Sequence, residues 1–516
     1  MHTIIIDNVY SQIVGDILPR IVIEQLNQQL SYSLQNAYFI VKSMNVKSGK
    51  NYHPRKEWDG KVKLFWHGNK LSKFYTGMAS EVVKIFKANN ISYTIEDNRV
   101  KPPQNCPNLA FKPLKNAEDR PYQDWTTDIA YKATRGIIEA ACGSGKTYCA
   151  TKLISKIKTV PFLFLVLSTD LLDQAQEMLS SCLNVPIGKI GDGVVDIQDI
   201  SVITVQTAIR AIHLGDKKFK IKDYKYDEDD NWNDDTLEKT KKGLEVQKLI
   251  AECKGLLFDE VHHCTAKVSK EVLRFAKQAY WKFGCSATPY REDGQEMMIQ
   301  ALFGKKLVQV SASYLIKHNF LVKPFIFNVH INKDPNLDEF NSYSNIYAQS
   351  IVNNEVSNKL VIELANHFEK KNMTTLILVQ QYAHGDNLKA IRPDLIFIKG
   401  NQPKKQRKQA LKDLKDGTIK IAIATTLADE GLDIKRLGAV IVAGGGKSIT
   451  RVYQRVGRTL RKFPGKDKAF VILLHHKCKF LEKHGKRVYN LLKKEEEFVV
   501  QQSTPESILQ DIQKII

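Results

Sequence analysis

Short apolar runs, separated by amphipathic segments, recur along most of this 516-residue chain. The first series reads GIIEAA, PFLFLVL, ISVITV, KGLLFDE and YWKFGCSAT, and the second reads KPFIFNVHI, TTLILVQ, DLIFIKG, KIAIATT, GAVIVAG and KAFVILL. Such runs suit strands that are buried on both faces, and their alternation with helices is typical of βαβ units. The chain is therefore predicted to be an α/β protein with two tandem lobes, each built on a parallel sheet.

Residues 1–98 precede the first series and carry turn signals of their own. The segment KVKLFW follows an Asp-Gly turn, and the alternation of Val62, Leu64 and Trp66 with the residues between them predicts a half-buried strand. Apolar positions at helical spacing from Ala79 to Ala88 predict a helix. We expect a small α/β (α+β) module that binds nucleic acid, with its strand lysines facing either a nucleic-acid backbone or solvent.

The other domain limits follow from composition. Four prolines in residues 99–119 disfavour both helix and central strand and predict a linker. The first lobe is expected over residues 120–322, the second over 323–480, and a helical tail over 481–516. The charge-dense segment at 216–242 predicts an exposed insertion in the first lobe.

Basic residues outnumber acidic ones. Lys and Arg number 77 against 56 Asp and Glu, which gives a formal net charge of +21. Residues 447–494 alone hold 15 basic residues and two acids. This balance favours a polyanionic partner, and nucleic acid is the expected one. Lys483, Lys486 and Arg487 in this segment are either phosphate contacts or part of a solvated helix face.

The eight cysteines form no CxxC pair, which is typical of reduced intracellular thiols. The first residues, MHTIIIDNVY, lack the features of a signal peptide, and no stretch approaches the ~18 apolar residues that span a bilayer. We therefore expect a soluble cytoplasmic protein without a membrane partner.

A phosphate loop, AACGSGKT, follows the run GIIEA and precedes a predicted helix. Its glycines let backbone N–H groups point at phosphates, and the helix N-terminus adds partial positive charge. Lys146 is expected to bind the β and γ phosphates of ATP, and Thr147 to supply its hydroxyl to Mg²⁺. The predicted cofactors are ATP and Mg²⁺, and the predicted binding residues are Gly143, Ser144, Gly145, Lys146 and Thr147.

DEVH, which begins at Asp259, follows the apolar run GLLF, so two carboxylates are expected at the tip of a strand. Asp259 is expected to hold Mg²⁺, and Glu260 to orient and deprotonate the attacking water. An acidic pair at a strand end is also a common cap, but the phosphate loop upstream favours catalysis.

The octet QRVGRTLR lies between the last two runs of the second series. Arg458 and Arg461 are three residues apart on a predicted helix, so we expect them to share a face and to reach one phosphate together. Guanidinium groups brought to the γ phosphate from another lobe stabilise the transition state. Gly457 weakens a helix and indicates close packing.

These motifs resemble those of the superfamily 2 helicases, and the match runs from Arg120 to about Leu474. The family's motifs occur in its own order as RPYQ from Arg120 to Gln123, AACGSGKT, DEVH, Ser286-Ala287-Thr288, ATTLADEGLDI from Ala424 to Ile434, and QRVGRTLR. The resemblance implies two RecA-like lobes that hydrolyse ATP between them and step along nucleic acid.

The resemblance also implies roles for single residues. The nucleotide cleft would be completed by Arg120 and Gln123, which read adenine, and by Gly431, Asp433, Gln454, Arg458 and Arg461. Nucleic acid would be contacted by Ser168, Thr169, Thr204, Gln206, Thr207, Gln380, Thr425 and Thr426. Hydroxyls and amides at strand ends suit sugar-phosphate contacts, although Ser and Thr there are also common helix caps.

The chain looks closest to the DNA-directed branch that contains XPB, RecG and the UvsW family of phage recombination helicases, and Trp58-Asp59-Gly60 resembles a turn of the UvsW amino-terminal domain. This resemblance implies an ATP-dependent DNA helicase that unwinds or branch-migrates forks and Holliday junctions in recombination, repair or replication. It would work in a bacterial host cytoplasm with replication or recombination proteins. Three alternatives stay open: an RNA-directed helicase, the motor subunit of a restriction system, and a non-motor nucleic-acid sensor that ATP switches.

Overall fold

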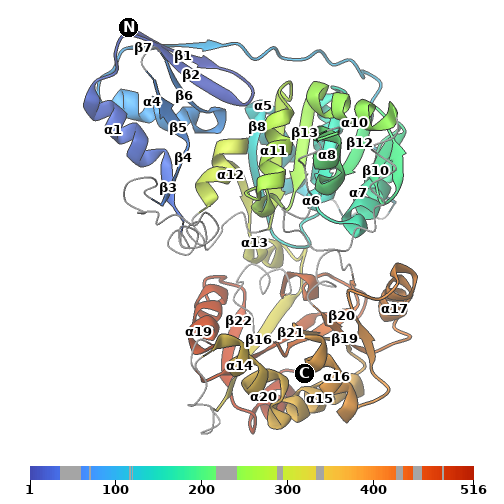
Figure 1. Ribbon diagram of the computed structural model, residues 1–516. Coiled ribbons are helices and arrows are strands. Elements are labelled where there is room, and N and C mark those ends of the chain that lie inside the picture. Colours follow the sequence, from blue (N-terminus) through green and yellow to red (C-terminus); the bar gives the residue numbers. More distant parts are fainter. Residues whose placement is uncertain are drawn as a thin grey trace. The chain divides into compact units, whose positions relative to one another are not determined.

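The structure is a computed structural model that describes residues 1–34, 60–68, 71–115, 118, 120–214, 216, 241–287, 295–332, 342–425, 434–444, 456–478 and 481–516. Contacts divide the chain into two compact units. One comprises Met1–Ala140 and Gly145–Gln309, and the other comprises Ala141–Ser144 and Val310–Ile516. The first unit thus holds the amino-terminal module together with lobe 1, and the second holds lobe 2 (Figure 1). The exact domain limits stay a prediction.

The amino-terminal module is a five-stranded sheet with two helices packed on it (Figure 1). The sheet order is β5 (Phe65–His67), β6 (Ser72–Tyr75), β2 (Tyr10–Gly15), β1 (His2–Ile6) and β7 (Tyr93–Asp97), and the helices are α1 (Arg20–Gln29) and α4 (Ala79–Ala88). α4 has the limits predicted from its apolar spacing, and it buries Val82, Ile85 and Phe86.

The single strand predicted for KVKLFW is wrong. β4 (Lys61–Lys63) pairs with β3 (Ser31–Ser33), whereas β5 pairs with β6. Leu64 is fully buried at the break, and its N–H donates to the Leu30 carbonyl (2.8 Å). The alternation therefore shifts by one residue, so that Phe65 enters the core and Trp66 is 41% exposed. Trp58 and Asp59 lie outside the described residues.

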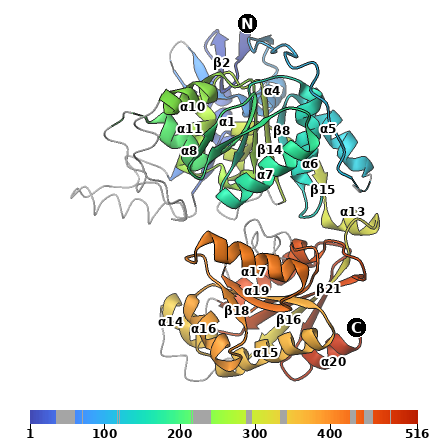
Figure 2. The same ribbon diagram turned by 90° about the vertical axis from the view of Figure 1, so that its right-hand side faces the viewer.

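Lobe 1 is an eight-stranded, mainly parallel sheet, as the first series of apolar runs predicts. The order is β11 (Val194–Asp196), β10 (Ile187–Gly191), β12 (Ile200–Thr204), β9 (Phe162–Val166), β13 (Gly255–Asp259), β14 (Trp281–Ser286), β8 (Arg135–Ala140) and β15 (Lys306–Val310). Helices cover both faces (Figures 1 and 2), with α5 (Pro121–Ala133), α6 (Lys146–Ile157) and α7 (Thr169–Cys182) on one and α8 (Val205–Ile212), α10 (Lys241–Glu252) and α11 (Lys267–Phe275) on the other. Most of the insertion predicted at 216–242 lies outside the described residues.

Lobe 2 is a seven-stranded parallel sheet. The order is β18 (Ile396–Ile398), β19 (Ile421–Thr425), β17 (Thr374–Val379), β20 (Leu437–Val442), β21 (Lys468–His476), β16 (Lys323–Ile331) and β22 (Val499–Ser503). The helices and turns of this lobe include α13 (Ala312–Lys317), α14 (Tyr343–Tyr347), the π-helical turn Ala348–Val352, α15 (Glu355–Lys370), α16 (Tyr382–Ile391), α17 (Lys404–Asp416), α19 (Leu481–Leu492) and α20 (Ile508–Gln513). The segment expected to be a helical tail also contains a strand, because β22 pairs with β16 in the sheet. Ile508 and Ile512 of α20 pack into the core of this lobe.

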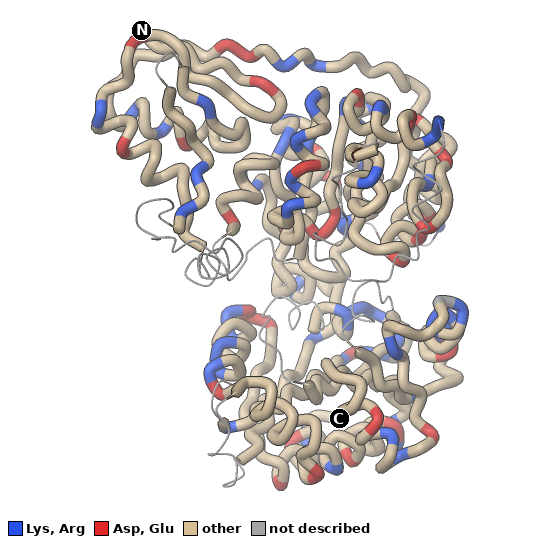
Figure 3. The backbone as a smooth tube through the Cα atoms, in the orientation of Figure 1, with Lys and Arg blue, Asp and Glu red and all other residues tan. Residues whose placement is uncertain are grey.

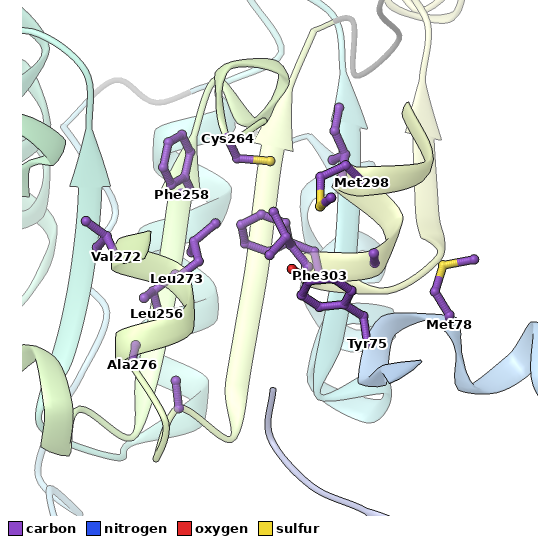
Figure 4. Packing of buried hydrophobic residues seen from close by; sticks show 14 of the residues in the cluster. Tyr75, Met78, Leu256, Phe258, Cys264, Val272, Leu273, Ala276, Met298 and Phe303 are labelled. Atoms are coloured by element: carbon purple, nitrogen blue, oxygen red, sulfur yellow. The ribbon is translucent and has the colours of Figure 1, made fainter. Parts of the chain in front are cut away.

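A shared hydrophobic core joins the module to lobe 1 (Figure 4). Met78 of the module belongs to the same cluster as Met298 and Phe303 of α12 (Glu296–Phe303). Gly77 packs so closely on α12 that a Cβ there would lie 2.1 Å from the carbonyl oxygen of Gln300. A larger residue at position 77 would therefore force the two parts apart.

Arg135, at the start of β8, adds a polar link between module and lobe. Its guanidinium donates to the carbonyl oxygens of Asn8 (3.2 Å), Leu302 (3.0 Å) and Phe303 (3.1 Å). Burial lowers the pKa of Arg135 to about 9, since desolvation disfavours the charged form. The module is thus fixed to lobe 1 by both apolar and charge-assisted contacts.

Two buried histidines make lobe 2 sensitive to acid. His476 at the end of β21 and His384 in α16 are 4% and 1% exposed, and burial lowers their pKa values to about 3 and about 4. The unfolded chain takes up protons at these positions below pH ~6.5, whereas the folded lobe does not until much lower pH. We expect the free energy of unfolding to be unaffected above pH 7 and to fall below it, by about 2 kcal/mol per histidine at pH 5.

Urea unfolding at pH 7.5 and pH 5.0 measures this loss. His476→Asn is expected to reduce this loss by about 2 kcal/mol at pH 5, because one suppressed protonation site is gone while His384 and the less strongly shifted His330, His367 and His475 remain. His318→Asn, at an exposed position, serves as the control and should lose as much as the wild type. Equal acid losses in both variants would contradict the assignment.

All eight cysteines are free thiols, and six of them are buried. Within the described part of the chain, no helix combines the length and the apolar character needed to cross a bilayer.

Candidate active site

The predicted phosphate loop lies at the carboxyl edge of the lobe 1 sheet. β8 ends at Ala140, and α6 begins at Lys146 after a tight turn. Gly143 and Gly145 have φ values of +82° and +78°, a backbone region that side chains disfavour. The sequence therefore forms the strand, turn and helix N-terminus that binding of phosphate requires.

Gln123, the predicted adenine-reading residue, lies beside this loop. It belongs to α5, which packs on α6, and it is 5% exposed. A Cβ at Gly145 would lie only 2.8 Å from the Gln123 Nε2, so the glycine leaves room for this amide. Arg120 donates to the Tyr122 hydroxyl (3.3 Å), and burial raises the pKa of Tyr122. Lobe 1 thus brings the two predicted nucleotide segments together, while adenine recognition stays a prediction.

The predicted acidic pair lies at the same edge. Asp259 is the last residue of β13, and Glu260 follows it with φ +51°, an uncommon conformation for this residue. Glu260 Oε1 lies 3.9 Å from Lys146 Nζ. The lysine predicted to bind phosphate and the predicted base are therefore neighbours in lobe 1.

The two carboxylates have pKa values that are shifted in opposite directions. Burial and then the charge of Glu260 raise the pKa of Asp259 to about 6. Burial also pushes the pKa of Glu260 upward, but the charge of Lys146 and the hydrogen bond from His262 outweigh it and hold this pKa below its ordinary value. Glu260 is therefore the carboxylate with the lower pKa, and it stays ionised in the range where Asp259 begins to take up a proton, as a base that accepts a proton must be.

Two residues that the sequence analysis left without a role complete this network. Ser286, at the end of β14, donates to Glu260 Oε2 (3.2 Å), and its hydroxyl lies 3.0 Å from His262 Nδ1. His262 Nδ1 is also 3.4 Å from Glu260 Oε2. β13 and β14 are adjacent parallel strands, so their carboxyl ends meet here. The sequence did contain a signal for both residues. His262 comes shortly after the apolar run GLLF, and Ser286 stands at the end of the run YWKFGCS.

Thr147 and Asp259 are the residues predicted to hold Mg²⁺. Among the described residues, no group of three or more His, Cys, Asp or Glu could hold a metal alone. Mg²⁺ is commonly held by one or two carboxylates together with water and phosphate oxygens, so this small donor set fits it. Asp259 also fits, because it is a buried carboxylate whose charge a cation would stabilise.

The nucleic-acid residues predicted in lobe 1 lie at the ends of the adjacent strands β9 and β12. Gln206 donates to the Leu167 carbonyl (2.8 Å) and so links the two strand ends. Ser168 and Thr204 accept N–H groups as the N-caps of α7 and α8, and Thr204 and Thr207 are buried. The hydroxyls of Ser168 and Thr204 therefore act as helix caps in this structure. Contact with nucleic acid stays a prediction for these two residues and for Thr169, Gln206 and Thr207.

In lobe 2, Gln380 directly follows β17, and Thr425 is the last residue of the adjacent strand β19. The Thr425 hydroxyl is buried and has no hydrogen-bond partner among the described residues. The other residues predicted in this lobe, Thr426, Gly431, Asp433 and Gln454, lie outside the described residues.

The predicted shared helix face of Arg458 and Arg461 is wrong. The described helical residues are 456–459, so that Arg458 is helical and Arg461 is not. Arg461 instead forms a β-bridge with Leu321, and the Val322 N–H donates to the Leu460 carbonyl (2.8 Å). Pairing with this segment draws the backbone out of the helix. Burial lowers the pKa of Arg461.

Two family models match the chain. Residues 112–291 match the family described as "Type III restriction enzyme, res subunit", and residues 356–463 match the "Helicase conserved C-terminal domain". Together the matches cover more than half of the chain and contain the phosphate loop, the acidic pair and both arginines. The chain belongs to the superfamily 2 helicases. Members of this superfamily use ATP.

Two proteins illustrate the similarity in sequence. "Putative helicase 22" of the Sulfolobus islandicus filamentous virus is 26% identical over 70% of this chain and 64% of its own length. "DNA 3'-5' translocase XPB2" of Sulfurisphaera tokodaii is 24% identical over 82% of this chain and 92% of its own length. This helicase thus spans slightly less than two thirds of the viral relative and most of the archaeal one.

Solved structures agree on the fold. A fragment of a putative HsdR subunit of a type I restriction enzyme from Vibrio vulnificus YJ016 covers 92% of this chain and 83% of its own, with a TM-score of 0.52 and 16% identity. At this identity the likeness concerns the fold alone, and it supports two RecA-like lobes. The alignment with UvsW of T4 covers 98% of this chain and 99% of UvsW, with 16% identity and a TM-score of 0.41.

Proposed function

We propose that this helicase is an ATP-driven DNA translocase that unwinds or branch-migrates branched DNA such as forks and Holliday junctions. The main support is that Lys146, Glu260 and Ser286 lie together at the carboxyl edge of the lobe 1 sheet. The chain also matches the two family models reported above. DNA as the substrate is supported by the similarity to XPB2, whose name describes a DNA translocase. The role in recombination, repair or replication rests on the sequence resemblance to the UvsW family.

In this proposal each lobe supplies separate groups to hydrolysis. Lys146 and the N–H groups of the loop bind the phosphates, and Glu260 orients the attacking water and accepts its proton. Mg²⁺, held by Thr147 and Asp259, would neutralise charge on the phosphates. Arg458 and Arg461 of lobe 2 would sense the γ phosphate, so that its loss changes how the two lobes hold DNA.

Surface charge in lobe 2 supports a nucleic-acid partner. Lys and Arg gather along α17 and α19 (Figure 3). Lys483, Lys486 and Arg487 of α19 are exposed, and Lys486 pairs with Glu482 (2.6 Å). Exposed cations of this kind suit phosphate contacts that are independent of sequence, and they should make binding sensitive to salt.

The test compares the wild type with Lys146→Ala on forked DNA, four-way junctions, linear duplex and RNA. We expect the wild type to hydrolyse ATP fastest and to displace strands best on forks and junctions. Lys146→Ala should lose at least about 10²-fold of both rates, because the phosphates lose their main cationic contact. Hydrolysis is measured by phosphate release, and displacement by the separation of labelled strands.

Each alternative gives a different result. Equal stimulation by RNA and junction DNA would contradict the preference for branched DNA. The result would favour an ATP-switched sensor if nucleic acid stimulates ATP hydrolysis but the protein neither displaces strands nor moves along DNA.

A motor subunit of a restriction system is the second candidate. It is favoured by the name of the family matched at residues 112–291. Such a motor should move along linear duplex without needing a fork or a junction. Displacement of a third strand from a linear triplex, at a rate equal to that on junctions, would favour this candidate.

A further inference from the structure

An aromatic cluster lies on the face of the module's sheet opposite Phe65 and Phe74. It consists of Tyr10 on β2, Trp66 on β5 and Tyr75 on β6. The Trp66 ring lies 6.0 Å from that of Tyr10 and 5.6 Å from that of Tyr75, and the two tyrosine rings are 4.8 Å apart. Tyr75 is 1% exposed, whereas Trp66 is 41% exposed. The cluster is thus anchored at one end and open to solvent at the other.

Cations from two different parts of the chain surround these rings. Lys73 is exposed, lies opposite Trp66 in the strand pairing, and places its Nζ 4.2 Å from the centre of the Tyr10 ring. Arg274 of α11 comes from lobe 1, and its guanidinium carbon lies 5.5 Å from the centre of the Tyr75 ring. Lys270 lies one helical turn before Arg274 on the same helix. Two cations therefore lie over rings of this aromatic cluster, and a third lies one helical turn from Arg274.

Acidic groups balance these cations only in part. The charge of Glu271 acts on both Lys270 and Arg274, although its carboxylate pairs with His213 (3.0 Å). Arg274 donates to the Tyr75 hydroxyl, but its Nε is buried without a hydrogen-bond partner among the residues that the structure describes. Burial and the neighbouring Arg274 lower the pKa of Lys270. An anion placed here would relieve the repulsion between the two neighbouring cations and satisfy the buried donor.

We propose that Trp66, Tyr10, Lys73 and Arg274 form an accessory site for single-stranded nucleic acid. An unpaired base stacks on the exposed indole, and Lys73 and Arg274 contact the flanking phosphates. A partly exposed aromatic ring among cations is how proteins hold single strands without reading their sequence, because every base has a flat aromatic face. The inference rests on the proposed function and adds which form of nucleic acid the module binds.

The contacts between module and lobe give this site a mechanical role. Tyr75 directly precedes the turn in which Gly77 packs on α12, and Arg274 belongs to lobe 1 itself. The site is therefore built from both parts of one compact unit and keeps its position relative to the acidic pair after β13. A strand held at Trp66 travels with lobe 1 as that lobe moves.

The test measures the affinity of the full-length protein for a fluorescein-labelled oligo(dT) strand and for a blunt duplex, without ATP. Trp66→Ala is expected to weaken binding of the single strand about tenfold, and Trp66→Phe less, because phenylalanine keeps part of the stacking surface. Binding of the blunt duplex should change less than twofold, since its bases are not available for stacking. Ile95→Ala is the matched control, because Ile95 is an exposed apolar residue (56%) on β7 of the same sheet.

A second pair of variants tests the charge. Lys73→Ala should remove about one phosphate contact. The slope of log affinity for the single strand against log salt concentration should become correspondingly less steep. Lys84→Ala, in which the lysine of α4 is already paired with Glu81 (2.9 Å), should leave it unchanged.

The possible outcomes separate this site from the proposed function. If Trp66→Ala binds oligo(dT) as tightly as Ile95→Ala, or if it loses single strand and blunt duplex equally, the stacking site is wrong. If the wild-type protein shows neither nucleic-acid binding nor stimulation of ATP hydrolysis, the proposed function itself fails.

Discussion

Replacing Glu260 with glutamine is expected to lower the turnover of ATP by about 10² to 10⁴-fold while ATP still binds. Glutamine has the shape of glutamate and can keep the contact with Ser286, but it cannot accept the proton of the attacking water. Lys146 and His262 hold the pKa of Glu260 low, so the wild-type residue is ionised at neutral pH and ready to act. Phosphate release measures turnover, and a fluorescent ATP analogue measures binding.

The control for this variant is Glu271→Gln. Glu271 is a partly buried acid of α11 in the same lobe, and it pairs with His213 (3.0 Å) away from the phosphate loop. Its turnover should stay within about threefold of the wild type. If Glu260→Gln also retains turnover within this range, another group must accept the proton.

Replacing Arg458 with alanine is expected to slow hydrolysis by about 10³-fold or more and to change ATP affinity only a few-fold. The reason is that a guanidinium from lobe 2 would act mainly on the charge that develops in the transition state. Arg458→Lys should rescue little, because a lysine ammonium lacks the planar, two-pronged geometry of arginine. Single-turnover hydrolysis and ATP binding are measured on the same preparations.

Lys359→Ala is the control, since it removes an exposed cation of lobe 2 that pairs with Glu355 on α15. It should hydrolyse ATP as the wild type does. Normal turnover in Arg458→Ala would shift the phosphate-sensing role to Arg461, which the structure places beyond the helix that contains Arg458.

The central strands of both lobes could be predicted because each is buried on both faces and therefore reads as a continuous apolar run. The strands that were missed lie at or next to sheet edges, where sequence is mixed. β10 reads IGKIG, and β22 reads VVQQS. At KVKLFW a break at Leu64 changed which residues face the core, and no local pattern signals that break.

In the candidate site, too, features set by neighbouring residues could be predicted, whereas features set by distant residues could not. The positions of Lys146, Asp259 and Glu260 at a helix start and a strand end could be predicted because each is defined by the few residues around it. The contact of Ser286 with His262 and Glu260 depends on which strands are neighbours in the sheet, and that information is not local. The position of Arg461 likewise depends on pairing with Leu321, which lies far away in the sequence.

The joint between module and lobe 1 has a consequence for synthesis of the chain. Met78 leaves the ribosome about 220 residues before Met298, the α12 residue in the same buried cluster. At 5–20 residues per second this interval lasts roughly 10 to 40 seconds. During that time the apolar surface around Tyr75 and Met78 has no α12 to cover it, so nascent chains that stop before α12 should be prone to aggregate and dependent on chaperones.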